Sequence, residues 1–107
     1  QACGNSYGRC QSKEVAVTVC DGAGCKHNCK DVNMTLGCNP SLSPAQGASV
    51  FLQCQNQYQG PTQVVALTHN KAQCADANTN VWTYNVSQCY PFGGEQSLKI
   101  VKACGAQ

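Results

Sequence analysis

Charged residues are scarce in this sequence. Only 11% of its 107 residues are Asp, Glu, Lys or Arg, and the formal net charge is +2. The basic residues form no run, so the sequence lacks the basic patch with which proteins bind nucleic acid. Polarity comes instead from 12 Gln and 9 Asn residues. We therefore expect no nucleic-acid partner and a surface made mainly of amides and hydroxyls.

Long apolar runs are lacking as well. No stretch approaches the roughly 18 apolar residues of a membrane-spanning helix, and no basic-then-apolar signal segment opens the chain. We expect no membrane span. A chain that begins at Gln1 is expected to be the mature form of a secreted protein whose signal has been removed.

Cysteine, in contrast, is abundant. The chain holds 10 cysteines, an even number, and this density is typical of small secreted proteins held together by disulfides. A chain this short buries only a modest core, so cross-links must supply much of its stability. We expect an extracellular protein with five disulfides, no free thiol and no catalytic cysteine. The half-cystines are Cys3, Cys10, Cys20, Cys25, Cys29, Cys38, Cys54, Cys74, Cys89 and Cys104.

The sequence contains an internal repeat. Val15 precedes Cys25 by 10 residues, and Val64 precedes Cys74 by the same interval. The next cysteines follow at intervals of 13 and 16 residues in the first passage, and of 15 and 15 in the second. This pattern predicts two β-units, approximately 15–54 and 64–104, preceded by a cysteine-bearing extension, 1–14.

Alternating apolar and polar residues predict strands and no long helix. The runs are rich in Val, Thr, Ile and aromatic residues and are separated by Gly, Asn, Pro and Asp. Alternation places Trp82, Tyr84 and Val86 on the core face of one strand. The expected strands are 15–19, 32–36, 50–58, 62–68, 81–87 and 98–103.

Cysteine arithmetic joins the two halves. Seven cysteines precede residue 61 and three follow it, so complete pairing requires an odd number of disulfides between the halves. The chain is therefore expected to form one domain, 1–107, as a disulfide-stapled β-sandwich of two duplicated Greek-key-like units. The individual pairings are left open.

Each unit has a late serine before an alternating strand, Ser49 in the first and Ser97 in the second. With the repeat length, this resembles the duplicated Greek-key units of βγ-crystallin-like proteins, whose small secreted members include killer toxins, antifungal proteins and fungal effectors. Two departures are the missing aromatic-x-Gly corner and the missing calcium signature, since 46–49 and 94–97 supply one carboxylate between them. We expect no calcium, no other metal and no cofactor.

Catalytic chemistry finds little support. His27 lies between Cys25 and Cys29, which invites a zinc site, but thiols in an oxidising compartment pair as disulfides. His27 and His69 are the two histidines that acid–base cleavage of RNA would need, and nothing in the sequence brings them together. We predict that the protein is not an enzyme and has no catalytic residues.

Recognition residues are more plausible candidates. A ladder of glutamines alternates through 53–59 and includes Gln55 and Gln57, with Tyr58 on the opposite face; such amides bind sugar hydroxyls, pair with a second copy or form a solvated edge strand. Tyr90 and Phe92 are predicted to lie on an exposed aromatic loop, 90–94, or to plug one end of the sandwich. Two glycosylation sequons begin at Asn33 and Asn85.

These features predict a secreted, non-enzymatic binding protein of antimicrobial, toxin or effector type, whose partner is an extracellular protein or glycan. One alternative is a structural protein that self-assembles as a homo-oligomer or filament, which low charge favours. A second alternative is a carbohydrate-binding module.

Overall fold

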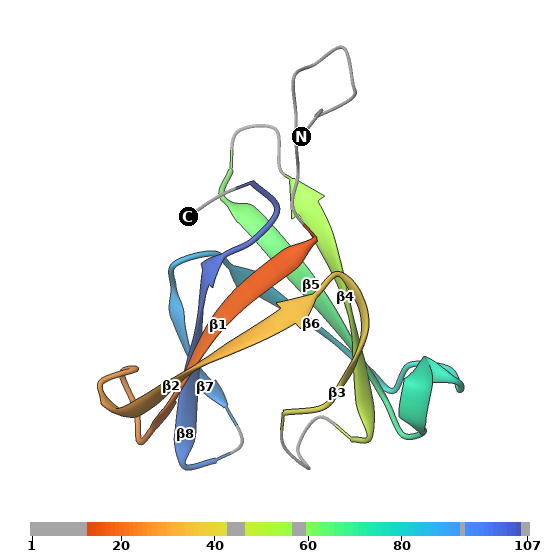
Figure 1. Ribbon diagram of the computed structural model, residues 1–107, viewed down its shortest axis with the longest axis horizontal. Coiled ribbons are helices and arrows are strands. Elements are labelled where there is room, and N and C mark those ends of the chain that lie inside the picture. The colour runs from red at the N-terminus through yellow and green to blue at the C-terminus, as the bar shows by residue number, and fades with distance from the viewer. Residues whose placement is uncertain (1–12, 43–46, 57–59, 93, 106–107) are drawn as a thin grey trace.

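The computed structural model describes residues 13–42, 47–56, 60–92 and 94–105, which form an all-β fold (Figure 1). These residues contain eight strands in two four-stranded antiparallel sheets. Sheet A has the order β2-β1-β8-β7, with β1 at Glu14–Asp21, β2 at His27–Thr35, β7 at Cys89–Phe92 and β8 at Gln96–Lys102. Sheet B has the order β3-β4-β5-β6, with β3 at Gly37–Pro40, β4 at Ser49–Asn56, β5 at Thr62–His69 and β6 at Asn80–Asn85. The prediction of an all-β, disulfide-stapled sandwich is confirmed.

Each sheet is built from both halves of the chain. Sheet A takes β1 and β2 from the first half and β7 and β8 from the second, while sheet B takes β3 and β4 from the first half and β5 and β6 from the second. The same positions in the two halves thus occupy opposite sheets: β1 corresponds to β5, β2 to β6, β3 to β7 and β4 to β8. Neither half forms a sheet alone, so the core between the sheets is shared.

Alternation of side chains explains why the central strands are buried on one side. In β1, Val15 and Val17 point into the core while Glu14 is exposed, and in β5 the buried inward residues are Val64 and Ala66. The remaining core side chains come from both sheets. They are Met34, Val50, Leu52, Phe92, Leu98, Ile100, Ala103 and Cys104.

Three disulfides join the two halves, and their pairing follows the repeat. Cys25–Cys89 and Cys38–Cys74 are equivalent bonds, since Cys25 corresponds to Cys74 and Cys38 to Cys89. Cys54–Cys104 joins two positions that correspond to each other. Three is an odd number, as the cysteine arithmetic requires.

A fourth disulfide, Cys20–Cys29, closes the hairpin between β1 and β2 and has no counterpart in the second half. The described cysteines include no free thiol. Cys3 and Cys10 lie outside the described residues.

Two strands were not predicted. β3 and β7 have four residues each and contain Pro40 and Pro91, which strand patterns normally exclude. Both lie at the edge of a sheet, where a missing N–H does not interrupt the ladder. The prediction of an exposed aromatic loop at 90–94 was therefore wrong for residues 90–92, which belong to β7.

Trp82 also departs from expectation. It lies on the same side of sheet B as its buried neighbour Ala66, but its side chain is 48% exposed. β6 is an edge strand, so the core does not extend far enough to cover the indole. Tyr84 and Val86, predicted on the same face, are half-buried against the core.

Candidate binding face

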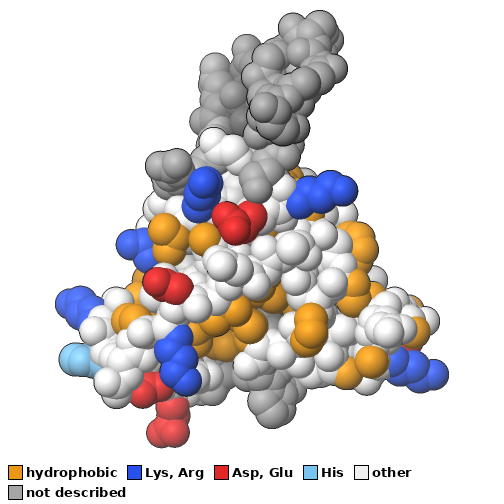
Figure 2. Space-filling view, viewed as in Figure 1, with side chains coloured by type: hydrophobic (Ala, Val, Ile, Leu, Met, Phe, Trp, Pro, Cys, Tyr) orange, Lys and Arg blue, Asp and Glu red, His pale blue; other side chains and the backbone are white. Residues whose placement is uncertain are grey.

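Charge is distributed unequally between the two sheets. None of the residues of β3, β4, β5 and β6 is Asp, Glu, Lys or Arg. The strands of sheet A carry Glu14, Asp21, Lys30, Asp31, Lys99 and Lys102. In Figure 2, the visible acidic side chains lie on the half of the molecule that contains β1 and β2. We call the outer surface of sheet B the uncharged face.

One end of the uncharged face is apolar. The strand register aligns Phe51 of β4 with Leu67 of β5, and Leu67 with Val81 of β6. Phe51 is 36% exposed and Val81 58% exposed, and Leu67 between them is half-buried. These three side chains form what we call the apolar row.

The other end is a row of hydrogen-bonded amides. Gln55 donates to Gln63 (3.3 Å), Gln63 donates to the side-chain oxygen of Asn85 (2.8 Å), and Asn85 donates to Gln88 (3.1 Å). Each amide therefore fixes the orientation of the next one. We call these four side chains the amide row.

The two rows lie on one surface. Phe51 and Gln55 are four residues apart in β4, which separates the rows by about 13 Å along the strands. Gln53 and Thr83 are exposed between the rows and flank Val65, which is 6% exposed. The arrangement offers a ligand apolar contact at one end and directional hydrogen bonds at the other.

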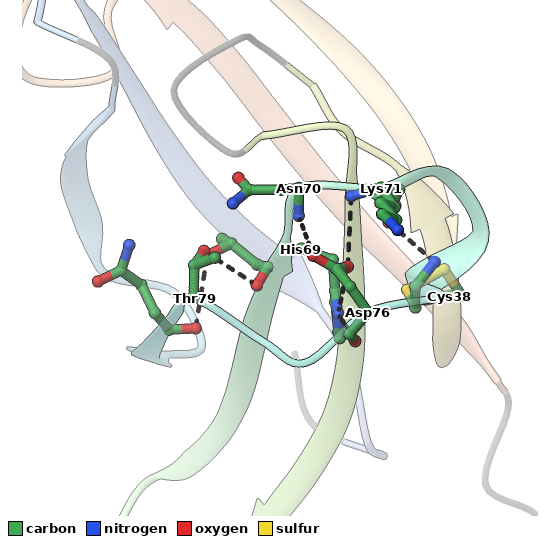
Figure 3. A network of polar contacts seen from close by, with 10 residues as sticks. Cys38, His69, Asn70, Lys71, Asp76 and Thr79 are labelled. Atoms are coloured by element: carbon green, nitrogen blue, oxygen red, sulfur yellow. Dashed lines mark hydrogen bonds and ion pairs between the residues drawn. A yellow bond between two sulfur atoms is a disulfide. The ribbon is translucent and has the colours of Figure 1, made fainter.

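Beyond the apolar row, a polar cluster orders the turn after β5. His69 Nδ1 lies 2.8 Å from the backbone oxygen of Asp76 and 3.4 Å from its carboxylate (Figure 3). The Asp76 carboxylate accepts from the backbone N–H of Asn70 and of Lys71. Burial of Asp76 raises its pKa, but these two N–H donors and the charge of His69 outweigh it, and the pKa lies below its ordinary value.

Ser49 lies opposite His69 in the register of β4 and β5, which brings Ser, His and Asp residues into one region. The Ser49 hydroxyl is nevertheless fully engaged elsewhere: it donates to the Lys71 carbonyl (2.6 Å) and accepts from the Cys74 N–H (2.9 Å). Ser49 and His69 are neighbours in the backbone ladder, but among the described residues no hydrogen bond joins the Ser49 hydroxyl to the His69 ring. The cluster is therefore not arranged as a nucleophile and its base.

The repeat clarifies what this cluster does. His69 occupies the position that corresponds to Cys20, whose disulfide to Cys29 closes the hairpin of the first half. The contact of His69 with Asp76 closes the equivalent turn in the second half. Both are structural closures of a turn.

The other predicted site residues are dispersed. His27 is exposed at the start of β2 in sheet A, whereas His69 is buried in β5 of sheet B, so the two histidines lie on different sheets. Asn33 is exposed in β2, and Asn85 is half-buried within the amide row. The described residues hold no group of three or more His, Cys, Asp and Glu side chains suited to a metal ion.

The predicted recognition residues divide into two groups. Gln55 belongs to the amide row, while Gln57 and Tyr58 lie outside the described residues. Phe92 is 5% exposed and belongs to the core, so it does not offer the exposed ring that binding would need. Tyr90 is half-buried, packs edge-to-face on Tyr84 at 5.0 Å and accepts from the Asn85 N–H (2.7 Å). The competing interpretation, in which this segment plugs one end of the sandwich, describes Tyr90 and Phe92 better than an exposed loop does.

The sequence prediction missed Phe51, Gln63 and Val81. A signal was present: residues 32–70 and 77–94 contain no charged residue. These two segments supply every strand of sheet B.

Comparisons with protein-family models, curated proteins and solved structures found no match. The resemblance to βγ-crystallin-like proteins stays a prediction. No helix in the described part of the chain has the length and hydrophobicity to cross a membrane.

Proposed function

We propose that this protein is a secreted, non-enzymatic binding protein of antimicrobial, toxin or effector type, and that it holds its extracellular target on the uncharged face. The observation that carries the proposal is the asymmetry between the sheets. Of the four large exposed hydrophobic side chains among the described residues, Phe51 and Val81 lie on the uncharged face, and sheet B has no charged residue in its strands.

A surface of this kind favours an uncharged target. Binding removes water from both partners, and a charged group that ends up unpaired costs several kcal/mol, so a face without charges avoids this penalty. Exposed aromatic and apolar side chains then contribute most of the binding energy. The four described disulfides fit an oxidising, extracellular compartment. The engagement of Ser49 and His69 in structural contacts supports a role without catalysis.

The amide row favours one particular target class, a neutral carbohydrate. Amides offer both a donor and an acceptor, as sugar hydroxyls do, and fixing their orientation in advance lowers the entropic cost of binding. Phe51 provides an exposed ring on the same face. A carbohydrate-binding module is therefore the second candidate function.

Sedimentation with insoluble polymers and cells tests the proposal. The fluorescently labelled, disulfide-intact protein is mixed with chitin, cellulose, β-1,3-glucan, intact yeast and intact bacteria, and the unbound fraction is measured. Phe51→Thr removes the ring from the uncharged face, and Val101→Thr is the control, since Val101 is an exposed hydrophobic side chain of sheet A.

We expect the wild-type protein to bind at least one of these surfaces, Phe51→Thr to weaken that binding about tenfold, and Val101→Thr to change it less than twofold. Binding by none of them, or normal binding by a correctly folded Phe51→Thr variant, would overturn the proposal. Carbohydrate binding is tested separately by Gln55→Thr, which shortens the amide row, with Asn33→Thr at an exposed position of β2 in sheet A as its control. Equal binding by these two variants would argue against the amide row.

A further inference from the structure

The sheet edges of this fold differ in how well they are protected against pairing with another chain. Edge strands present unpaired N–H and C=O groups, and proteins protect them with charges, proline or short length. β2 carries Lys30 and Asp31, and β3 and β7 are four residues long with Pro40 and Pro91. Three of the four edges formed by the described strands are therefore protected.

β6 is the exception. Its six residues, Asn80–Asn85, include no proline and no charge, and its side chains at Val81 and Trp82 are 58% and 48% exposed. We propose that β6 is an assembly edge, at which it pairs antiparallel with β6 of a second copy of this chain.

Hydrogen bonds at the end of β6 fix which backbone groups face outward. The Val86 N–H donates to the Thr62 carbonyl of β5 (3.0 Å), whereas the Asn85 N–H donates to the Tyr90 hydroxyl (2.7 Å) and so is directed away from β5. Backbone groups alternate in direction along an antiparallel strand. Val81 and Thr83 therefore direct their N–H and C=O groups to the open edge, as Asn85 does.

This geometry selects one register. If Trp82 lies opposite Trp82 of the second copy, Val81 faces Thr83 of that copy at both ends of the pair, and the outward groups make four N–H···O bonds. The same register keeps the two uncharged faces on the same side of the combined sheet, because residues of equal parity are paired. The indoles meet at a non-hydrogen-bonded position, where side chains of opposite strands lie closest.

The absence of charge on β6 favours its pairing with β6 of a second copy. Pairing β6 with itself brings no like charges together, because neither β6 nor β5 beside it contains a charged residue. The result is a continuous eight-stranded sheet in which the apolar row and the amide row are each present twice.

Sedimentation velocity of the full chain, from about 1 µM to 1 mM, tests the proposal. The expected result is a monomer–dimer equilibrium, weak because one strand pair buries little surface. Trp82 is the only tryptophan, so its emission should shift to shorter wavelength as the dimer forms. Hydrogen exchange of the Val81 and Thr83 amides should slow with concentration.

Thr83→Lys places two positive charges across the two-fold axis and should weaken the dimer at least tenfold. Asn33→Lys adds the same charge to an exposed position of β2 and should change the dimer less than twofold. Both variants bring the net charge from +2 to +3, so general repulsion between copies is matched. A monomer at 1 mM, or a dimer that forms equally well in Thr83→Lys, would overturn the proposal. A dimer without slower exchange at Val81 and Thr83 would also overturn it.

Discussion

The two repeat-equivalent serines allow a quantitative test of the fold. Ser49 and Ser97 are each 1% exposed, and each hydroxyl accepts a backbone N–H from a cysteine of the other half: Cys74 for Ser49 and Cys25 for Ser97, both at 2.9 Å. The two cysteines have left-handed backbone conformations, with φ of 53° for Cys74 and 57° for Cys25. The serines therefore hold the turns that carry Cys38–Cys74 and Cys25–Cys89.

Replacement by alanine removes a different number of hydrogen bonds at the two sites. Ser49→Ala loses the bond from Cys74 and the bond to the Lys71 carbonyl, while Ser97→Ala loses the bond from Cys25. A hydrogen bond in a partly buried setting contributes about 1 kcal/mol to stability. We expect the free energy of unfolding to fall by about 2 kcal/mol in Ser49→Ala and by about 1 kcal/mol in Ser97→Ala.

Guanidinium unfolding of the disulfide-intact variants, followed by Trp82 fluorescence, measures these losses. The double variant should lose the sum of the two, about 3 kcal/mol, since the sites share no partner. Asn78→Ala in an exposed loop is the control and should change stability by less than about 0.5 kcal/mol. A loss in Ser97→Ala that exceeds the loss in Ser49→Ala, or no loss in either, would refute this account of the turns.

Three further predictions follow from the described contacts. Phe92→Ser should lower the free energy of unfolding by about 3–4 kcal/mol, because the Phe92 ring is buried in the core. Tyr90→Phe should lower it by about 1 kcal/mol, because the hydroxyl that accepts the Asn85 N–H is lost. An unchanged melting temperature in Phe92→Ser would contradict the burial of this ring and support the exposed loop. Ionised Asp76 has a lowered pKa, so it stabilises the folded protein above the unfolded pKa of about 3.9 and this contribution is lost as the pH falls through the lower folded value. Asp76→Asn should therefore be less stable than the wild type above about pH 4, and urea titrations at decreasing pH should show the difference closing; a difference that persists at pH 2 would be inconsistent with it. A thiol reagent added to the unfolded, unreduced protein should give no adduct, because the 10 cysteines are expected to be fully paired, and a single adduct would contradict this.

The strands with strong alternation were predictable, and the short edge strands were not. Period-two spacing alone predicts the buried faces of the central strands, with Val15 and Val17 in β1 and with Val64 and Ala66 in β5. β3 and β7 contain proline and only four residues each, so their strand conformation depends on the neighbouring strand, which the sequence pattern does not report.

The disulfide pairing could not be predicted from the sequence, because several pairings satisfy the same cysteine count. The repeat explains the pairing only together with the sheet topology, in which the equivalent strands β1 and β5 lie in opposite sheets. Two of the bonds between the halves join cysteines of different rank, as Cys25–Cys89 does, whereas Cys54–Cys104 joins cysteines of the same rank.

The uncharged face was only partly predictable. The glutamines of β4 were identified as a ladder along one strand, but the observed amide row crosses three strands and continues to Gln88. Gln63 and Asn85 lie 22 residues apart in sequence, and only the β5–β6 register brings them together.

The side-chain amide signals in a ¹⁵N-correlation spectrum test the central claim most directly, because glutamine and asparagine NH₂ groups report contacts at their own positions. The protein is titrated with soluble oligomers or fragments of the polymer or cell surface that the wild type binds. The account predicts shifts for Gln55, Gln63 and Asn85 on the uncharged face, and none for Asn33 on sheet A. Shifts at Asn33 with unchanged signals from Gln55, Gln63 and Asn85 would contradict it.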